Sequence, residues 1–499
     1  MISEELLSCV KAIIVVTTIK ILLIPSYHST DFEVHRNWLA ITHSLPVSKW
    51  YYEHTSEWTL DYPPFFAWFE YGLSLFAGFF DEKMLDITNL NYASPKTVLF
   101  QRLTVQITDF VLIFAVAYYF RLFSDPHPSK RTLTVFFLIL FAPGFLIVDH
   151  IHFQYNGYLI GLFTLSIVLV YHNHPLLGAL VYSIAMNSKH LFCFQAPIFL
   201  VFLLRTYCFD SSLRFSFRHF FQLAAIVLAI FFFSLYPVLR GNIPANLRQF
   251  LSRLFPFQRG IIHSYWAPNL WALYAGIDRI LAALLPALCR LRGVFCHIPV
   301  LPSNTADGRV EIATFSVLPE VSSILTILLM LGSYIPVILS LWRRGDKKAF
   351  LRSVSLTTFL YFLCGWHVHE KAILPTVILC GLLAGESARD ARIFWLLSLS
   401  GSVGLFPLLF TPRDVVTEVM LTGVYGVLSW QGLELALRPL DWLAVMVLGG
   451  SVIAYCVGPL LVPSLPFLPL MAVSLGCAVV NCYVFVLMAV QFFVHPKRV

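Results

Sequence analysis

Long apolar runs recur along almost the whole 499-residue sequence, and they constrain the fold more than any other feature. Hydrophobic residues make up 58% of the chain and the mean hydropathy is +0.77, which is far more apolar than a soluble domain requires. A membrane-spanning helix needs about 20 mostly apolar residues. The runs are too long and too uniformly apolar for the alternating strands of a barrel. The sequence therefore predicts an all-α polytopic membrane protein embedded in a lipid bilayer.

The first run, residues 6–25, is not followed by a small-residue cleavage site and predicts a retained helix, with Lys20 reaching the membrane interface. We expect about fourteen transmembrane helices within a single integral-membrane domain spanning residues 1–499. Two long polar loops, residues 26–101 and 241–319, interrupt the helices. Seven of the Trp and Tyr residues in the first loop indicate a structure lying on the membrane surface: Trp38, Trp50, Tyr51, Tyr52, Trp58, Tyr62 and Trp68.

The net charge of +7 is confined to short connectors and the C-terminus, so it indicates membrane orientation and not a nucleic-acid partner. With about fourteen helices, the basic connectors all fall on the cytoplasmic side together with the N-terminus. By the same parity, the unusual polar segments of the chain all fall on the opposite face. Their segregation predicts one composite site on the lumenal or extracellular side.

Charged residues cluster directly after the first run, at residues 30–38. Asp31 could accept a proton from a bound hydroxyl, which makes it our candidate general base. Glu33 and Arg36 share the cluster, and for an isolated Asp-x-Glu an N-cap or a surface pair with Arg36 is the commoner explanation. Asp61, which precedes Tyr62 and two prolines, most simply shapes a turn, with substrate contact as the alternative.

A second polar segment interrupts two apolar runs with Asp149, His150, His152, Gln154 and Asn156. Asp149 and the two histidines raise the alternative of a metal, but no further acidic or cysteine cluster completes a ligand set. Hydrogen bonding to a sugar or phosphate is the use we expect, and we predict no metal.

The third polar segment is His367-Val368-His369-Glu370-Lys371, which offers cations beside one anion. Its spacing is not that of a zinc protease. In the second loop, Arg253 and Arg259 flank an apolar stretch and suit a phosphate, with lipid headgroups as the alternative. A disulfide between Cys289 and Cys296 is open if that loop faces an oxidising lumen.

Five motifs, in this order, resemble the endoplasmic-reticulum glucosyltransferases that use dolichyl-phosphate-glucose, a family with the C-type (GT-C) glycosyltransferase fold. They cover nearly the whole chain: residues 31–38 (DFEVHRNW), 60–64 (LDYPP), 152–156 (HFQYN), 253–260 (RLFPFQRG) and 368–371 (VHEK). Residues 30–36, 65–70 and 365–372 resemble the family member that adds the second glucose.

The resemblance implies transfer of an α-1,3-linked glucose, with inversion, from dolichyl-phosphate-glucose to Glc1Man9GlcNAc2 on dolichyl diphosphate in the lumen of the endoplasmic reticulum. It implies no cofactor and no metal requirement. It places the general base at Asp31, in agreement with the reading of the residues. A phosphate leaving group needs a cationic partner, and we expect His369, with Lys371, Arg259 and His367, to fill that role. Glu33, Arg36, Asp61, Glu370 and the 149–156 segment are left as acceptor-binding or structural groups.

Three alternatives remain at this point. The sister enzyme of the family adds the first glucose to Man9GlcNAc2-diphosphodolichol. A secondary transporter would show mid-membrane acids, broken helices and internal repeats, whereas this chain gathers its polar residues in loops on one face. A non-catalytic scaffold would tolerate Asp31→Asn.

Overall fold

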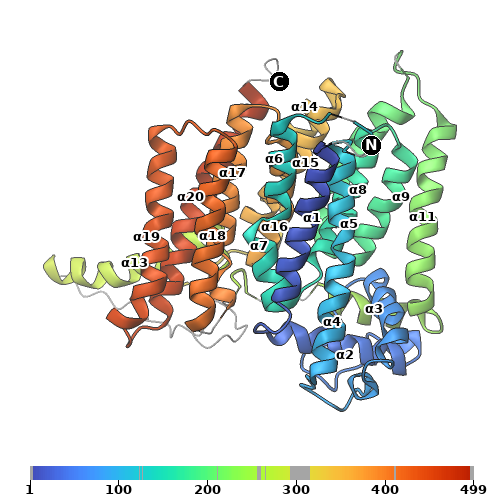
Figure 1. Ribbon diagram of the computed structural model, residues 1–499, viewed down its shortest axis with the longest axis horizontal. Coiled ribbons are helices and arrows are strands. Elements are labelled where there is room, and N and C mark those ends of the chain that lie inside the picture. The colour runs from blue at the N-terminus through green and yellow to red at the C-terminus, as the bar shows by residue number, and fades with distance from the viewer. Residues whose placement is uncertain are drawn as a thin grey trace. The chain divides into compact units, whose positions relative to one another are not determined.

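The computed structural model describes residues 4–122, 124–125, 127–210, 212–255, 260–263, 266–292, 315–409 and 412–494. Across these residues the chain is helical, with a single isolated β-bridge between Phe209 and Phe215 and no strand (Figure 1). The chain divides into two compact units. Unit 1 comprises Met1–Pro256 and Leu341–Leu351, and unit 2 comprises Phe257–Ser340 and Arg352–Val499.

Among the described residues, nine helical segments are long and apolar enough to cross a membrane, and two shorter apolar helices accompany them. The prediction of an all-α, multi-pass protein is confirmed at this level. The nine segments are Pro95–Tyr119, Lys130–Phe153, His190–Cys208, Phe217–Leu239, Leu270–Leu291, Ser323–Arg344, Ala388–Leu408, Pro439–Leu461 and Phe467–Val494. The shorter two, α8 (Asn156–Tyr171) and α9 (Pro175–Ser188), fall where the apolar runs are shorter than a full span.

Several spanning segments of unit 1 are assembled from consecutive short helices. α1 (Glu4–Leu22) is followed, after the first loop, by α4 (Pro95–Thr108) and α5 (Phe110–Tyr119), which run on almost without a break (Figure 1). α6 (Lys130–Leu140) continues through α7 (Pro143–Phe145) into the π-helix η3 (Leu146–Phe153). η4 (His190–Gln195), α10 (Ala196–Leu203) and η5 (Leu204–Cys208) form another such segment.

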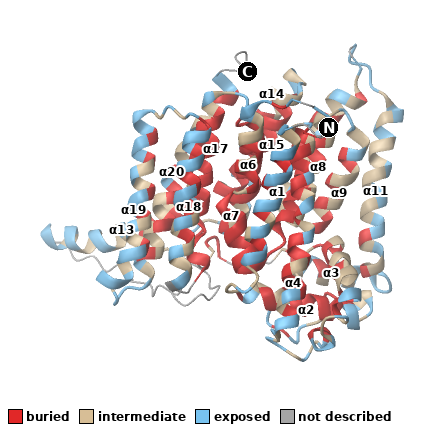
Figure 2. Cartoon of the chain, in the orientation of Figure 1, coloured by how far each residue is buried: buried red, intermediate tan, exposed pale blue. Residues whose placement is uncertain are grey.

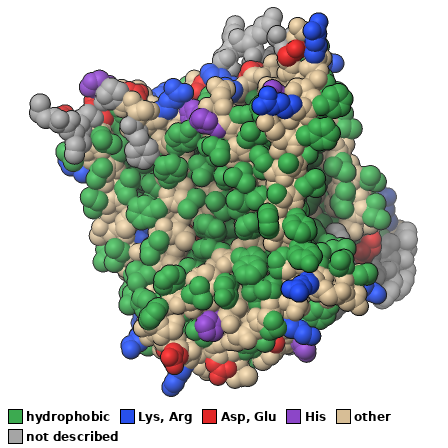
Figure 3. Space-filling view, turned by 90° about the vertical axis from the view of Figure 1, so that its right-hand side faces the viewer, with side chains coloured by type: hydrophobic (Ala, Val, Ile, Leu, Met, Phe, Trp, Pro, Cys, Tyr) green, Lys and Arg blue, Asp and Glu red, His purple; other side chains and the backbone are tan. Residues whose placement is uncertain are grey.

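The long helix α11 (Phe217–Leu239) presents an apolar face to its surroundings. Phe221, Leu228 and Phe233 are more than 60% exposed, with values of 63%, 67% and 69%. Figure 3 shows the face of the molecule on the α11 side, where hydrophobic side chains fill a broad middle zone and charged and His side chains gather above and below it. An exposed apolar surface of this kind is suited to lipid and not to water.

The first loop is a folded layer of helices: α2 (Thr30–Ser44), η1 (Val47–Lys49), α3 (Pro64–Ala77) and η2 (Glu82–Leu85). Figure 2 shows buried residues concentrated in α2, beside α3 and the beginning of α4. The expectation that the loop's aromatic residues lie on a membrane surface is wrong for Trp38, Trp50 and Tyr51, which are 2%, 1% and 2% exposed. They instead form the loop's own core, because edge-to-face contacts such as Trp50 on Trp68 bury their large apolar area.

Unit 2 is built around α17 (Ala388–Val403), and 94% of the residues in the most apolar stretch of Ala388–Leu408 are buried (Figure 2). It packs against α16 (Leu374–Leu383), α18 (Pro412–Gly432), α19 (Pro439–Leu461) and α20 (Phe467–Val494). Polar contacts fix the packing: Ser400 donates to Asn481 at 2.7 Å, and Arg352 forms a two-pronged ion pair with Asp390 at 2.8 and 2.9 Å. η7 (Phe406–Leu408) follows α17.

The second loop contains more structure than the sequence indicated. Residues 241–319 were expected to form a loop, but α12 (Ile243–Leu254) and α13 (Leu270–Leu291) lie within them. α13 contacts α20, and Figure 1 shows it lying crosswise to α19 and α20. α14 (Ser323–Arg344), α15 (Lys347–Cys364) and η6 (Glu370–Ile373) complete the helices. Arg259 and Cys296 lie outside the described residues.

Candidate active site

Asp31 lies in the first turn of α2, at a helix N-terminus that is tied to a distant segment. Ser29 is the N-cap, and its hydroxyl accepts a hydrogen bond from the Asp31 amide at 3.2 Å. The Ser29 amide and hydroxyl both donate to the carbonyl of His152, at 2.9 and 2.8 Å. The start of α2 and the end of η3 are therefore fastened together, although 123 residues separate Ser29 from His152.

The carboxylate of Asp31 is held by two side chains from this second segment. His152 Nε2 lies 3.0 Å from Asp31 Oδ2, and the Gln154 amide donates to the same oxygen at 2.5 Å. The Asp31 side chain is 22% exposed, whereas that of His152 is 7% exposed. The structure thus brings together three predicted site residues, in a geometry that orients a carboxylate while keeping it accessible.

Arg102 on α4, which the sequence reasoning did not select, organises the end of η3. Its guanidinium donates to the carbonyls of His150 and Ile151, each at 2.8 Å, and to the carbonyl of Tyr27 at 2.8 Å. A π-helix leaves backbone carbonyls at its end without the usual helical partners, and π-helical turns are frequent at functional sites. One fully buried arginine thus connects the segment that follows α1 to the segment that carries His152.

Asp149 and His150 do not form their hydrogen bonds with Asp31 but with other residues. Asp149 accepts from Asn156 at 2.8 Å and from the Gly157 amide at 2.7 Å, which satisfies the N-terminus of α8. Lys189 donates to the Asn156 side chain at 3.2 Å. A Cβ added to Gly157 would lie only 1.7 Å from Asp109 Oδ1, so the helix approaches its neighbour more closely than any other residue permits.

His150 belongs to a buried ionic group. Its Nε2 lies 2.6 Å from Asp109 Oδ2, and Lys20 of α1 donates to the same oxygen at 2.8 Å. Asp149, His150 and His152 therefore each have a separate partner. Neither Lys20 nor Asp109 could be paired from the sequence, because 89 residues separate them.

Glu33 and Arg36 pair with each other inside the folded first loop. Arg36 meets Glu33 with two hydrogen bonds of 2.8 and 2.7 Å and donates to the carbonyls of Met84 and Asp86 at 3.0 and 2.9 Å. Arg36 is fully buried. A two-pronged pair with further backbone contacts is a strong tether for the loop.

A second buried pair, His35 with Glu70 of α3, lies at 2.7 Å. Burial raises the pKa of the Glu70 carboxyl, and the contact with His35 opposes that rise. Neither residue was selected as a site residue from the sequence, although both lie in segments that carry the resemblance.

Asp61 precedes Tyr62 and Pro63, and α3 begins three residues after it, at Pro64. Burial, and after it the carboxylates of Asp61, Asp31 and Asp149, raise the pKa of the Tyr62 hydroxyl well above its usual value. Three predicted acids therefore act on one tyrosine of unit 1. Lys189 lies over the same ring, 5.4 Å from its centre.

Arg253 of α12 reaches the first loop and donates to the carbonyl of Tyr51 at 3.1 Å. Burial lowers the pKa of Arg253, and the nearby carboxylate of Asp61 opposes this. The beginning of the second loop therefore lies against the first loop, near Asp61, within unit 1.

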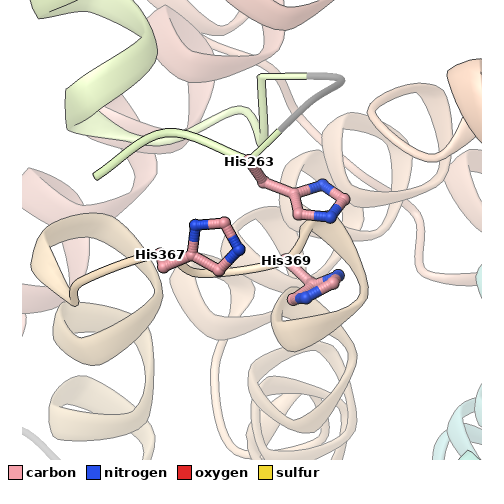
Figure 4. A group of neighbouring side chains, drawn as sticks. All are labelled: His263, His367 and His369. Atoms are coloured by element: carbon pink, nitrogen blue, oxygen red, sulfur yellow. The ribbon is translucent and has the colours of Figure 1, made fainter. Parts of the chain in front are cut away.

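Four further predicted residues lie in unit 2: His367, His369, Glu370 and Lys371. His367 Nδ1 donates to the carbonyl of Gly260 at 2.6 Å, and His263, which the sequence reasoning missed, lies 3.2 Å from the buried Glu370 carboxylate. Burial alone would raise the pKa of Glu370, but His263 and Lys371 lower it to about 2. Figure 4 shows His263 beside His367 and His369. His263 could have been selected from the sequence because it lies only a few residues after Arg259.

The fold and these residues define a multi-pass membrane protein in which a partly exposed carboxylate is oriented by a polar π-helical segment. The family model described as "ALG6, ALG8 glycosyltransferase family" matches residues 16–488, and the chain belongs to this family. The protein is accordingly a glycosyltransferase. Family membership leaves no support for the transporter alternative.

Curated relatives match over most of their length. One from Mus musculus is 43% identical over 93% of this chain and 91% of its own length. One from Schizosaccharomyces pombe is 44% identical over 83% and 82%, and one from Arabidopsis thaliana is 39% identical over 93% and 94%. Each is named dolichyl pyrophosphate Glc1Man9GlcNAc2 alpha-1,3-glucosyltransferase.

Proposed function

We propose that this protein transfers glucose from dolichyl-phosphate-glucose, in α-1,3 linkage and with inversion, to Glc1Man9GlcNAc2-diphosphodolichol. The reaction takes place at the lumenal face of the endoplasmic-reticulum membrane, within a GT-C fold, as the resemblance implies. The apolar runs of the sequence favour about fourteen transmembrane helices for this fold. Two observations support the acceptor: the names of the relatives and the match over nearly the whole chain.

The observation that carries the mechanism is the carboxylate of Asp31, held by His152 and Gln154 and still 22% exposed. Asp31 takes the proton of the acceptor hydroxyl as that oxygen attacks the anomeric carbon of the donor glucose. The bond between the anomeric carbon and the donor phosphate oxygen breaks, and dolichyl phosphate leaves with the electron pair. A single displacement of this kind inverts the anomeric configuration and needs one base.

The leaving phosphate develops negative charge, which cationic or hydrogen-bond-donating groups stabilise. His369, Lys371, Arg259 and His367 are proposed for this role. Among them, His369 is exposed and Lys371 is half-buried in unit 2. Because phosphate is a good leaving group, the mechanism requires no acid opposite Asp31.

The test is glucosyl transfer by the purified protein in detergent, with acceptors that carry no, one or two glucoses. We expect wild type to extend only the one-glucose acceptor, and Asp31→Asn to lose at least about 100-fold in turnover. Glu57→Gln, which changes an exposed carboxylate of the same loop, should behave as wild type.

Transfer to the glucose-free acceptor would identify the sister reaction instead. An active Asp31→Asn variant would refute the assignment of the base. Donor binding by Asp31→Asn, measured separately, shows whether a loss of turnover reflects chemistry or binding.

A further inference from the structure

Three histidines of unit 2 form a compact group. One nitrogen or the other of His263, His367 and His369 can be chosen so that all three ligand atoms lie within 4.8 Å of one another. The rings of His263 and His369 have centroids 3.8 Å apart (Figure 4). The residues come from two separate segments of the chain, so their meeting is a product of the fold.

One ring has the hydrogen bond typical of a metal-bound histidine, and a second lies beside a carboxylate. Nδ1 of His367 donates to the Gly260 carbonyl at 2.6 Å, and Nδ1 of His263 lies 3.2 Å from Glu370 Oε2. Metal-ligating histidines almost always donate their other ring nitrogen to a carboxylate or a backbone carbonyl. The contact with the Gly260 carbonyl fixes the tautomer of His367 and makes Nε2 the ligand atom of that ring.

The backbone holds the group in place. His367 has a φ of +49°, a left-handed conformation that is uncommon outside glycine. Directly before this turn, a Cβ on Gly365 would lie 2.7 Å from the Tyr361 carbonyl. A non-glycine residue persists in such a conformation when its surroundings over-determine it, and these conformations cluster at ligand sites.

We propose that His263, His367 and His369 bind a divalent transition-metal ion, with Zn²⁺ as the best match. Three imidazoles suit a tetrahedral ion whose fourth position takes water or an anionic oxygen, and they disfavour Mg²⁺ and Ca²⁺, which prefer oxygen ligands. The buried carboxylate of Glu370 supplies negative charge behind the site. Since Zn–N bonds measure about 2.0–2.1 Å, the rings must draw closer together, and the exposed His369 is the member with room to move.

The proposal concerns binding and does not make the ion a requirement for turnover. The site shares His367 and His369 with the proposed donor-phosphate group, but its test needs neither donor nor acceptor. The inference therefore stands or falls separately from the proposed function.

The experiment uses full-length protein in detergent, purified through a tag that contains no histidine and stripped with a chelator. Zn²⁺ is titrated in competition with a chromophoric chelator, and Co²⁺ is titrated while visible absorption is recorded. We expect about one ion per chain, with the intense Co²⁺ absorption of a tetrahedral site. Glu370→Gln should weaken binding by about 10- to 100-fold, because the orientation of His263 is lost.

His263→Gln and His369→Gln should abolish this binding, whereas His54→Gln, at an exposed histidine of unit 1, should retain it. Thermal unfolding of each variant verifies that it is folded. Equal stoichiometry and affinity in wild type and His369→Gln would overturn the proposal, as would a folded wild type that binds neither ion.

Discussion

At the scale of single residues, the acids Asp31 and Glu33 lie two positions apart in the sequence but have different surroundings. Asp31 faces His152 and Gln154 and keeps 22% of its side chain exposed, whereas Glu33 is 10% exposed and joined to the buried Arg36. A general base must be accessible to its substrate, whereas a carboxylate that only forms a structural ion pair can be buried. The structure therefore distinguishes the two acids by their exposure and by the side chains they contact. The Asp-x-Glu sequence pattern alone could not distinguish them.

Removal of the Glu33 charge should affect stability more than chemistry. Glu33→Gln leaves the buried Arg36 without its anion, and breaking a buried pair in this way costs about 3–5 kcal/mol. We expect a clear fall in the thermal unfolding temperature in detergent, with near-normal turnover per folded molecule. Asp31→Asn should show the opposite pattern, and a Glu33→Gln variant that is stable but inactive would make Glu33 the better candidate base.

Gln154 offers a test of the environment of the base. Gln154→Glu replaces a donor 2.5 Å from Asp31 Oδ2 with a second carboxylate. Two carboxylates so close cannot both ionise easily, so the proton is retained to higher pH. The acid limb of the pH profile of kcat/KM should therefore move upward. Gln154→Ala, which removes the donor without adding a charge, should move it much less; identical profiles for the two variants would exclude Asp31 as the titrating base.

At the scale of elements, the site depends on the end of the π-helix η3. Its position is set by Ser29 at the start of α2 and by Arg102 on α4, through carbonyl contacts of 2.8–2.9 Å. Together these contacts place the end of η3, and with it His152, against Asp31, while the Arg102 guanidinium acts on the backbone carbonyls of His150 and Ile151. Arg102 is thus a positioning residue.

Arg102→Lys keeps the charge but loses the planar fork that serves three carbonyls at once. We expect turnover to fall about tenfold or more as the His152 segment shifts, with donor KM changed by less than about twofold. Arg218→Lys, at an exposed arginine in the first turn of α11, is the matched control. A rise in donor KM at unchanged kcat would show that Arg102 acts on binding and not on the geometry of the base.

The sequence predicted those helices that form because a long apolar run spans the membrane. It failed to predict the helices that form because of contacts with distant parts of the chain. Apolar runs of the sequence at residues 157–171, 219–240 and 440–462 correspond to α8, α11 and α19 within one or two residues at each end. α13 was missed because arginines and prolines around it resemble a loop, although its face toward α20 is apolar. The helical layer of the first loop was missed because its aromatic residues are buried against one another.

The same division holds for the site. Asp31, His152 and Gln154 were selected because they stand out as polar residues against apolar runs, and in the structure their side chains meet. Arg102, Asp109 and Ser29 were not selected, since their partners lie far away in sequence. Only the fold could pair them.

At the scale of the whole molecule, the proposed reaction requires the first loop to face the lumen. The charge distribution supports this orientation, because basic connectors lie at the opposite ends of the predicted helices. The native sequence contains no Asn-x-Ser/Thr acceptor sequence, so a glycan on an introduced one would report topology without background.

Two single substitutions create such sequences on the two sides. Glu57→Asn produces one with Trp58 and Thr59 in the first loop, and Asp210→Asn produces one with Ser211 and Ser212 in the connector before α11. Both replaced side chains are exposed, and asparagine can keep the turn-capping role that Asp210 has through its contact with the Ser212 amide at 2.8 Å. Expressed in microsomal membranes, the position-57 variant should gain a glycosidase-sensitive increase in mass and the position-210 variant should not. The reverse result would place Asp31 on the cytoplasmic side, where a lumenal oligosaccharide acceptor could not reach it.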